Sequence, residues 1–402
     1  MLLIPALAWL LPTCMASVLF VYDDKNIDRT KMLNKLKEVL PFETDIQGCS
    51  TDPKEMIPIF GSGRRLFDNL FFMTAEIPAK YKKEQLVRFV ETGGNLLWSF
   101  DGRMNGVGKE TVEIAKLFGR VLETKLEAVI DYFANEGSAE SVLVQARNEI
   151  VLPNLPRNIY MSGLSHRLDR TNPLVFPILS ASSTAAKTNK LPGNENLLVS
   201  GLSTRNGSRV VLSTTNDLFL DVTFNERVVR DLTSWTFGHR GKLQVTRFAY
   251  KLDERTDAEV PRIRDSFEAE LCLKVSNSKG EMVPFQPEGE IQVELVMMNP
   301  VIRATLHPSE GGCLSSGTLQ LPSRYGAYSL HVRYQHHGYN PIVLKEPMTV
   351  YPYRYNQTPR FAKVLWPYFA GWFTNLFGTF FVLLPVLLYS RHRSGIIKKK
   401  IK

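Results

Sequence analysis

The chain has 402 residues, 44% of them hydrophobic and 22% charged, which is typical of globular proteins and leaves room for two domains. Its formal net charge is +9, but the last twelve residues carry six Lys or Arg and no acid. Subtracting these six leaves +3 for everything before them, too little for a surface that binds a polyanion. The charge distribution therefore excludes DNA and RNA as partners.

The first residues have the features of a secretory signal peptide. Leu2–Leu11 is an apolar run, and small residues follow up to Ala16, although no Lys or Arg precedes the run. A buried first strand or helix is the alternative, but a second apolar run, Val18–Tyr22, follows at once. We therefore expect a signal peptide over residues 1–16.

Residues 17–238 alternate between continuous apolar runs and helical periods. Continuous runs are typical of strands covered on both faces, and strands that alternate with helices imply a parallel sheet. The sequence therefore predicts an α/β domain. Its strands contain Val18–Tyr22, Leu70–Met73, Leu96–Trp98, Leu197–Val199 and Val210–Leu212, and its helices contain Leu33–Leu40, Leu86–Val90, Val112–Phe118 and Val228–Trp235.

Residues 239–360 have a different pattern, in which short stretches of alternating polarity are separated by Gly, Pro, Asn and Ser. This pattern is typical of an antiparallel β-sandwich. The predicted strands are Phe267–Val275, Ile291–Val296, Tyr328–Tyr334 and Ile342–Val350.

Residues 364–390 carry no charged side chain, and a helix of that length reaches roughly 40 Å, enough to cross a bilayer. The basic residues 391–402 follow, so the positive-inside rule places this tail in the cytosol and the bulk of the chain in the lumen. A buried core helix is the weaker alternative. Asn375 lies inside the predicted span, where it faces either a partner helix or the membrane interface.

The sequence ends in Lys399-Lys400-Ile401-Lys402. This spacing resembles the dilysine retrieval signal of endoplasmic reticulum membrane proteins, although a basic tail can match it by chance. We expect Lys399 and Lys400 to retain the protein in the endoplasmic reticulum membrane as a single-pass type I protein.

Acidic residues follow the predicted parallel strands, where open sheets bind ligands. Asp24, Glu76 and Asp101, together with Asp23, Thr74 and Arg103, could hold a sugar, a cation or a general base. Capping of the next helices explains the same residues more simply, and we favour it.

A nucleophile–base pair is the other chemical possibility in the α/β domain, since it contains Cys49 and His166. Cys49 lies in a polar stretch and not at a strand-to-helix elbow, which argues against this role. Gly61–Arg65 precedes its strand and is therefore no phosphate-binding loop, and His336-His337 is expected on a strand, with the two rings on opposite faces. No metal or other cofactor is expected.

The remaining cysteines and the sequons fit the oxidising lumen. A disulfide between Cys272 and Cys313 would leave Cys49 free, although spacing alone does not fix the pairing. Asn206 and Asn356 are candidate N-glycosylation sites, and Asn356 lies close to the predicted membrane span.

Nine segments in this order resemble the 48 kDa subunit family of oligosaccharyltransferase, the complex that transfers a lipid-linked glycan to asparagine. The segments are VLFVYDD from Val18, LFDNLFF from Leu66, GGNLL from Gly93, AVID from Ala128, NPLVFPILSASST from Asn172, NLLVSGLSTRNGSRVVLS from Asn196, VPFQPEGEIQVELV from Val283, RYGAYSLHVRY from Arg324 and WPYFAG from Trp366.

The resemblance implies a non-catalytic, accessory subunit in a hetero-oligomer with the catalytic polytopic subunit and small membrane subunits. It also implies that the α/β domain is similar to class I glutamine amidotransferases without their nucleophile. The catalytic subunit carries Trp-Trp-Asp-Tyr-Gly, and no adjacent tryptophans occur here. The alternatives are a luminal thiol hydrolase using Cys49 and His166, and a retained glycan-binding cargo receptor using Asp24, Glu76 and Asp101.

Overall fold

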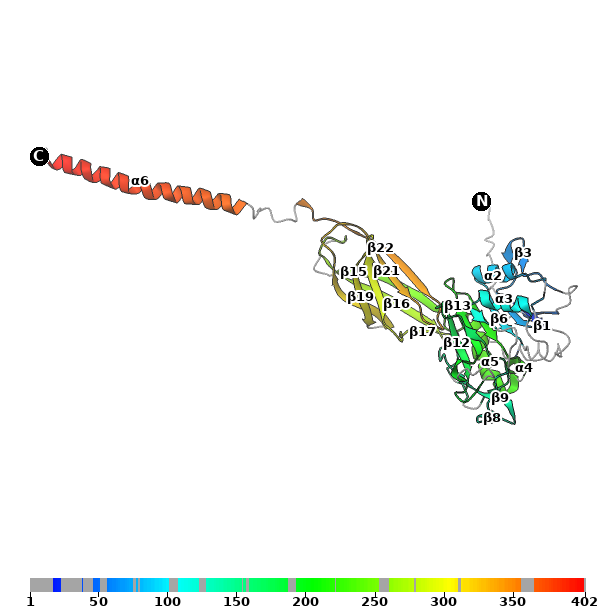
Figure 1. Ribbon diagram of the computed structural model, residues 1–402. Helices are drawn as coiled ribbons and strands as arrows, with labels where there is room; N and C mark the ends of the chain where they lie inside the picture. Colours follow the sequence, from blue (N-terminus) through cyan, green and yellow to red (C-terminus); the bar gives the residue numbers. More distant parts are fainter. Residues whose placement is uncertain are drawn as a thin grey trace, which may run out of the picture.

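The computed structural model describes most of the chain between Ser17 and Lys400 (Figure 1). The described residues are 17–22, 38, 46–50, 56–74, 77–78, 80–100, 108–122, 128–153, 155–156, 159–186, 193–220, 222–252, 260–277, 280–309, 312–355 and 365–400. The expected signal peptide and all but one residue of the first expected helix, Leu33–Leu40, lie outside them.

The N-terminal part is built on a mixed ten-stranded sheet in the order β10-β9-β12-β13-β14-β6-β5-β1-β2, with β8 paired to β9. Its strands are β1 (Val18–Tyr22), β2 (Ile46–Ser50), β5 (Asn69–Met73), β6 (Asn95–Ser99), β8 (Asn135–Glu136), β9 (Ser138–Ala146), β10 (Tyr160–Met161), β12 (Val175–Ala181), β13 (Leu197–Ser203) and β14 (Arg209–Ser213).

Only one half of this sheet is parallel, which corrects the prediction of a parallel sheet. The pairs β2–β1, β1–β5, β5–β6 and β6–β14 are parallel, whereas β13, β12, β9 and β10 add to β14 in antiparallel order. The strands β13 and β14 are joined by the short turn after Ser203, and a short turn can connect only antiparallel neighbours. The apolar runs of both strands suggested burial correctly but carried no information on direction.

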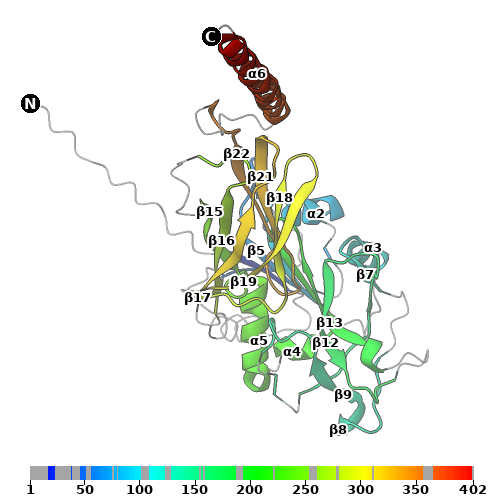
Figure 2. The ribbon, with the colours of Figure 1, turned by 90° about the vertical axis from the view of Figure 1, so that its left-hand side faces the viewer.

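Helices cover both faces of the sheet and create two cores, because successive side chains of a strand point to opposite faces (Figure 2). Phe20 and Phe71 pack with the helices α4 (Asp217–Leu220) and α5 (Val222–Thr236), and Leu19 and Leu70 pack with α2 (Lys83–Glu91) and α3 (Lys109–Leu117). The small elements around this sheet are β3 (Phe60–Gly61), β4 (Arg64–Arg65), β7 (Arg120–Val121), β11 (Arg167–Leu168) and the 3₁₀-helix η1 (Gly193–Glu195).

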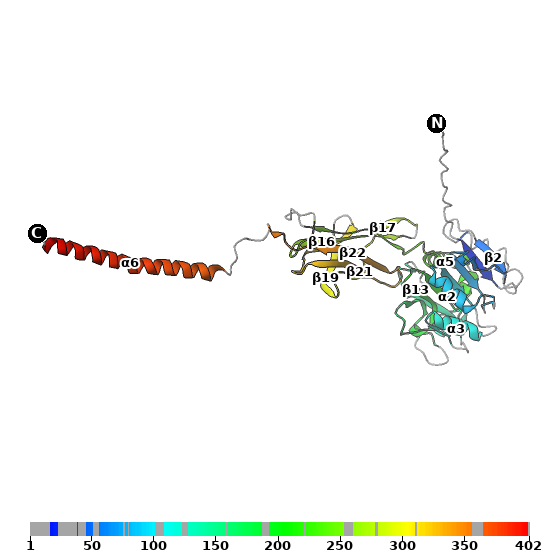
Figure 3. The same ribbon diagram turned by 90° about the horizontal axis from the view of Figure 1, so that it is seen from above.

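Every strand pair described in the second part is antiparallel, and the strands are connected in the order β15-β16-β20-β19-β18-β21-β22, with β17 on β16. Figure 3 shows this part between the mixed sheet and the C-terminal helix. The path is nearly closed, since its end strands β15 and β22 contact each other. The expected antiparallel β domain is thus present, as one continuous path. Its strands are β15 (Leu243–Leu252), β16 (Ser266–Ser276), β17 (Met282–Pro284), β18 (Ile291–Val296), β19 (Pro300–Pro308), β20 (Cys313–Gln320), β21 (Gly326–Tyr334) and β22 (Ile342–Val350).

The C-terminal helix α6 (Trp366–Lys400) contains one candidate membrane span, Trp366–Arg393, by length and composition. Its most apolar window is not buried against the described parts of the protein, and Figure 1 shows the helix extending away from both domains. An uncovered helical segment of this length and hydropathy is suited to an apolar environment.

Candidate functional site

The acidic edge expected after the parallel strands is described only in part. Thr74 follows β5 and is buried, whereas Asp23, Asp24, Glu76, Asp101 and Arg103 lie outside the described residues. A glycan- or cation-binding role for these acids therefore stays a prediction.

The structure separates Cys49 from His166. Cys49 lies on the edge strand β2, in the same row of the sheet as Ser200 on β13, five strands away. At about 4.8 Å per strand, the two residues are roughly 24 Å apart. Nε2 of His166 lies 2.8 Å from Oγ of Ser200, which fixes the imidazole at the far side of the sheet. This separation argues against the thiol–imidazole pair that was considered as an alternative.

His166 and Ser200 instead belong to a sealed polar cluster around Arg120. The Arg120 guanidinium donates to Oγ of Ser200 at 3.1 Å and to the carbonyl oxygen of Val210 at 2.8 Å. Burial, and then the charge of Arg120, lower the pKa of His166 to about 3, so its ring is neutral at pH 7. All three side chains are buried, so this serine–histidine pair cannot reach a substrate and has a structural role.

Arg209, at the start of β14, is the centre of the junction between the two domains. Its guanidinium donates to the carbonyl oxygens of Trp235, Arg240 and Gly241, the last at 2.8 Å, and lies 4.8 Å from the Trp235 ring centroid. Burial lowers its pKa to about 9, so the group stays charged at pH 7. One cation thus fixes both the end of α5 and the connection that leads into β15.

The loop between β21 and β22 reaches back to the α/β domain and completes the junction. Nε1 of Trp235 donates to the carbonyl oxygen of Gly338 at 2.6 Å, and Oγ of Ser203 donates to the carbonyl oxygen of Tyr339 at 3.3 Å. A Cβ on Gly338 would lie 2.9 Å from Ile150, and its φ of +99° also favours glycine. The close approach of the two domains therefore requires glycine at this position.

His336 and His337 lie in this loop and not on a strand, which corrects the position expected for them. The ring of His337 lies 5.2 Å from that of Phe176 of the α/β domain, whereas His336 stacks beside Tyr334. The two imidazoles thus serve different contacts, and only His337 contacts the other domain.

A cleft of about 450 Å³ opens beside the junction. Its polar groups are of mixed character, with Arg240 paired to Asp231 at 3.2 Å and Tyr339 beside Glu288. Partial burial, and then Glu288, raise the pKa of Tyr339, so its phenol stays neutral. The cleft is lined by Glu149, Ile150, Pro153, Arg240, Gly241, Val275, Ser276, Asn277, Val283, Glu288 and Tyr339.

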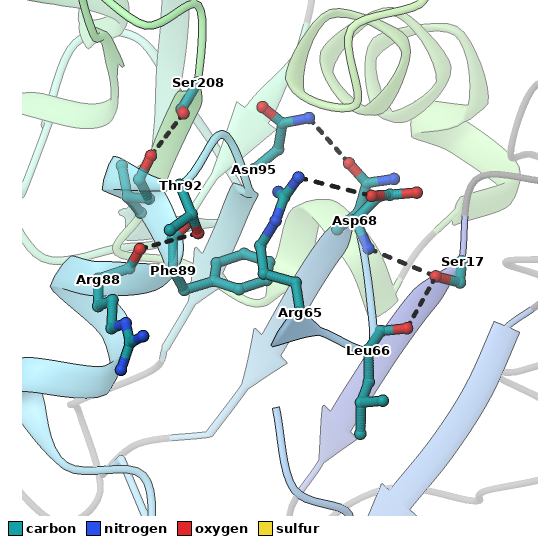
Figure 4. A network of polar contacts seen from close by, with 11 residues as sticks. Ser17, Arg65, Leu66, Asp68, Arg88, Phe89, Thr92, Asn95 and Ser208 are labelled. Atoms are coloured by element: carbon teal, nitrogen blue, oxygen red, sulfur yellow. Dashed lines mark hydrogen bonds and ion pairs between the residues drawn. The ribbon is translucent and has the colours of Figure 1, made fainter. Parts of the chain in front are cut away.

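The sequon Asn206-Gly207-Ser208 forms the turn between β13 and β14. Asn206 is exposed, and its amide donates to the carbonyl oxygen of Glu91 at 2.9 Å. Ser208 is buried and donates to the carbonyl oxygen of Val90 at 2.6 Å, so the turn is fastened to the end of α2 (Figure 4). Occupancy of Asn206 stays a prediction, as does that of Asn356, which lies outside the described residues.

A polar network continues from this turn toward the start of β1 (Figure 4). Nδ2 of Asn95 donates to Asn69 at 2.9 Å, and the backbone amide of Asp68 donates to Oγ of Ser17 at 3.4 Å. An ion pair of 3.8 Å joins Arg65 to Asp68, and the guanidinium of Arg65 lies 5.8 Å from the Phe89 ring centroid. These contacts hold the amino-terminal ends of the parallel strands together and form no site for chemistry.

Cys272 and Cys313 form a disulfide between the paired strands β16 and β20. Together with Glu270 they are the one group of three close metal-ligand side chains among the described residues. The sulfurs are bonded to each other and Glu270 lies 2.7 Å from Lys251, so the group suits structure and not metal binding.

The membrane residues of interest lie on α6. Asn375 is in the first half of the candidate span and is exposed. Its backbone carbonyl oxygen accepts a hydrogen bond from Oγ1 of Thr379 at 2.8 Å. The backbone of Lys399 and Lys400 continues the helix, but their side chains are outside the described part, as is Ile401-Lys402. The retrieval signal stays a prediction.

Sequence reasoning missed Arg209, Trp235 and Gly338 as the residues that join the domains. The one available signal was Arg209 itself, a charged residue directly before the apolar run of a buried strand. Its acceptors are backbone carbonyls, which no residue pattern identifies.

Two family models match the chain. The OST48 N-terminal domain matches residues 11–239, and the OST48 middle domain matches residues 249–391. The first range contains the mixed sheet and its helices. The second contains all but the start of the β domain, together with all but the last two residues of the candidate span.

The chain is also similar to named proteins over most of its length. It is 27% identical to the dolichyl-diphosphooligosaccharide–protein glycosyltransferase subunit wbp1 of Schizosaccharomyces pombe over 386 residues, which cover 85% of this chain and 86% of that protein. It is 26% identical to the 48 kDa subunit of Arabidopsis thaliana over 369 residues, with coverages of 82% and 83%. A solved thua-like protein from Bacteroides uniformis covers 54% of this chain and 89% of its own, at 17% identity and a TM-score of 0.34.

Proposed function

Because the chain belongs to the OST48 family, we propose that it is an accessory subunit of oligosaccharyltransferase that supports protein N-glycosylation. In this role it assists the transfer of a lipid-linked oligosaccharide to asparagine residues of nascent polypeptides. The observation that carries the proposal is the ordered match of both family models to the two domains and the candidate span.

A non-catalytic role agrees with the chemistry of the described residues. Cys49 lies five strands, or roughly 24 Å, from Ser200, and Oγ of Ser200 lies 2.8 Å from Nε2 of His166. The Ser200–His166 pair is sealed by Arg120. A nucleophile needs a base within hydrogen-bond reach and access to substrate, and neither arrangement provides both.

We further propose that the protein is a type I protein of the endoplasmic reticulum membrane with both β-containing domains in the lumen. The uncharged segment 364–390 is followed by six basic residues without an acid, which favours a cytosolic tail. The Cys272–Cys313 disulfide suits an oxidising compartment. Lys399 and Lys400 supply retrieval in this proposal.

The partners proposed are the catalytic polytopic subunit and small membrane subunits. A single helix cannot enclose a lipid-linked substrate, so it contributes by packing against other helices. Asn375 is the residue we expect at such a contact, because an amide in lipid is costly without a partner. Replacing Asn375 by leucine should weaken recovery of the polytopic subunit about 3- to 30-fold, the equivalent of one interhelical hydrogen bond.

That measurement uses the full chain, purified through a tag in mild detergent. Phe381→Leu, in the same helix and 71% exposed, serves as the matched control and should leave recovery unchanged. Equal recovery with Asn375→Leu and wild type would mean that the amide points toward the interface.

The finer features of the architecture are also proposals. We infer domains at residues 17–238 and 239–360 after a signal peptide at 1–16, with a span at 364–390 and a tail at 391–402. An amidotransferase-like origin of the first domain is supported by its five neighbouring parallel strands, β2-β1-β5-β6-β14, with helices on both faces.

Depletion of the protein is the direct test of its function. A secreted reporter glycoprotein should then migrate faster on gels, and a glycosidase should remove the difference between depleted and normal cells. Wild type and Cys49→Ala should both restore glycosylation, since the thiol has no catalytic task in this proposal. Normal glycosylation after depletion contradicts the proposal, and failure of Cys49→Ala despite normal folding supports an enzyme instead.

A further inference from the structure

Four segments meet at the end of the β domain from which the chain leaves for α6. They are residues 260–265, 296–300, 321–326 and 351–355, here named the tethered end. Gly326 pairs with Val350, the backbone amide of Leu321 donates to Asp265 at 2.8 Å, and that of Ile263 donates to Tyr351 at 3.0 Å. In Figure 1 this end lies opposite β17, which faces the α/β domain.

Large apolar and tyrosine side chains are exposed at the tethered end. Met298, in the turn between β18 and β19, is 91% exposed, Tyr355 is 86% exposed and Tyr325 is 65% exposed. Met297, Val301 and Tyr353 are also exposed around them. Scattered exposed apolar residues are normal, but a group gathered at one end of a domain indicates an interaction surface.

This surface is held in place by the fold. The methyl group of Met297 lies across Gly326, where a Cβ would come within 2.8 Å of it. The hydroxyl of Tyr328 donates to the carbonyl oxygen of Arg324 at 2.9 Å, which holds the loop that carries Tyr325. The backbone around Met297 and Tyr325 is therefore pre-organised, which lowers the ordering entropy lost on binding.

The position of the tethered end in the chain identifies the occupant. Tyr355 is eleven residues before Trp366, the first residue of α6, and eleven residues span at most about 40 Å. The start of α6 carries Trp366, Tyr368 and Trp372, residue types that prefer the headgroup level of a bilayer. The tethered end is thus kept within a short distance of the membrane surface, and it also displays tyrosines.

Charge points to an interaction that depends on apolar contacts. The four segments contain four arginines and one aspartate, a net charge of +3. Residues 253–259, which connect β15 to the tethered end, contain four acids and one arginine, a net charge of −3. Charges of both signs thus occur in and next to these segments, and the exposed apolar side chains carry the interaction.

We propose that the tethered end docks onto the surface of the bilayer that holds α6, with Met298, Tyr325 and Tyr355 at the boundary of headgroups and acyl chains. The docking fixes the height and tilt of both domains above the membrane. It depends on α6 crossing a bilayer and goes beyond the role in glycosylation.

Quenching of a fluorescent probe at defined positions tests this docking. The full chain is reconstituted into phosphatidylcholine nanodiscs, with a probe attached to Met298→Cys. Met282→Cys, on β17 at the opposite end, is the matched control, and Phe380→Cys reports the insertion of α6. Cys49 is buried, and labelling of the wild-type chain measures its background. Lipid-borne nitroxides should quench positions 298 and 380, whereas dissolved iodide should quench position 282.

A charge at the centre of the surface provides the second measurement. Met298→Asp, read by a probe on Tyr325→Cys, should reduce the docked fraction by about tenfold, since it replaces the burial of an apolar side chain. Met282→Asp should change nothing. Both substitutions are at exposed positions, so folding is preserved.

Three results would overturn the proposal. The first is quenching of position 298 by iodide and not by lipid while position 380 is quenched by lipid, which leaves the anchored subunit and its role in glycosylation intact. The second is protection of position 298 from both quenchers, because a protein partner then covers the end. The third is absence of lipid quenching at position 380, because the premise of a spanning helix then fails.

Discussion

Replacement of Arg209 by methionine should destabilise the protein by separating its two domains. Methionine preserves most of the aliphatic length of the side chain but removes every donor of the guanidinium. The carbonyl oxygens of Trp235, Arg240 and Gly241 then lose the donor that binds them in the wild type. None of these acceptors can be removed together with the arginine, because all three belong to the backbone.

The size of the effect follows from these three contacts. A buried acceptor without a donor, here the carbonyl oxygen of Gly241, costs about 1–3 kcal/mol. The carbonyl oxygen of Trp235 keeps the backbone amide of Gly238 at 3.1 Å, so the loss of its second hydrogen bond costs about 1 kcal/mol. The cation–π contact with Trp235 adds about 1 kcal/mol. Relief of the buried charge offsets part of this sum, since burial already lowers the pKa of Arg209 to about 9. We therefore expect the free energy of unfolding to fall by about 2–4 kcal/mol.

Urea unfolding of the full chain in detergent, followed by tryptophan fluorescence, measures this difference. Limited proteolysis of the connection at residues 238–242 provides a second measure, and Arg209→Met should be cleaved faster there. Arg205→Met is the matched control, because Arg205 is exposed in the same turn and its loss should change the stability by less than about 0.5 kcal/mol. A loss for Arg209→Met no larger than that of Arg205→Met would refute the reasoning.

Three further predictions concern pH, the disulfide and retention. The folded protein holds His166 neutral, with a pKa of about 3, whereas the unfolded chain binds a proton at this residue below about pH 6.5. The free energy of unfolding should therefore fall as the pH is lowered from about 6.5 to about 3, by up to about 1.4 kcal/mol per pH unit. His166→Gln should lose this slope in unfolding titrations, and equal slopes would contradict it. Replacing Cys272 and Cys313 by serine should lower the free energy of unfolding by about 2–4 kcal/mol, because the bridge closes a loop with a sequence separation of 41; a midpoint unchanged in urea would argue against this. Changing Lys399 and Lys400 to serine should let a reporter fusion acquire Golgi-type glycans, and continued sensitivity to endoglycosidase H would show that other signals retain it.

Local patterns in the sequence identified many elements of the fold. The apolar runs at Val18–Tyr22 and Leu96–Trp98 are the strands β1 and β6, and the apolar spacing around Phe89 is that of α2. The alternation through Phe267–Val275 is β16, with every second residue from Phe267 to Leu273 buried. These assignments succeed because the period of side chains along a strand or helix depends only on neighbouring residues.

Other strands escaped prediction because their own residues do not show that pattern. β2 contains Gln47, Gly48 and Ser50 beside its apolar residues Ile46 and Cys49, and it is recognised only through its pairing with β1. The antiparallel direction of β13 and β12 likewise depends on turns and partners, since an apolar strand reads the same in either direction.

The sequence by itself determined the order of a mixed α/β part, an antiparallel β part and one apolar helix, because composition and periodicity are local properties. Only the tertiary structure decided that Cys49 and His166 lie far apart, that Arg209 binds the end of α5, and that Gly338 meets Trp235 from 103 residues away. Such contacts depend on how distant segments close on each other. Segments separated by the same number of residues can come together in many tertiary arrangements, and burial of the whole chain selects one of them.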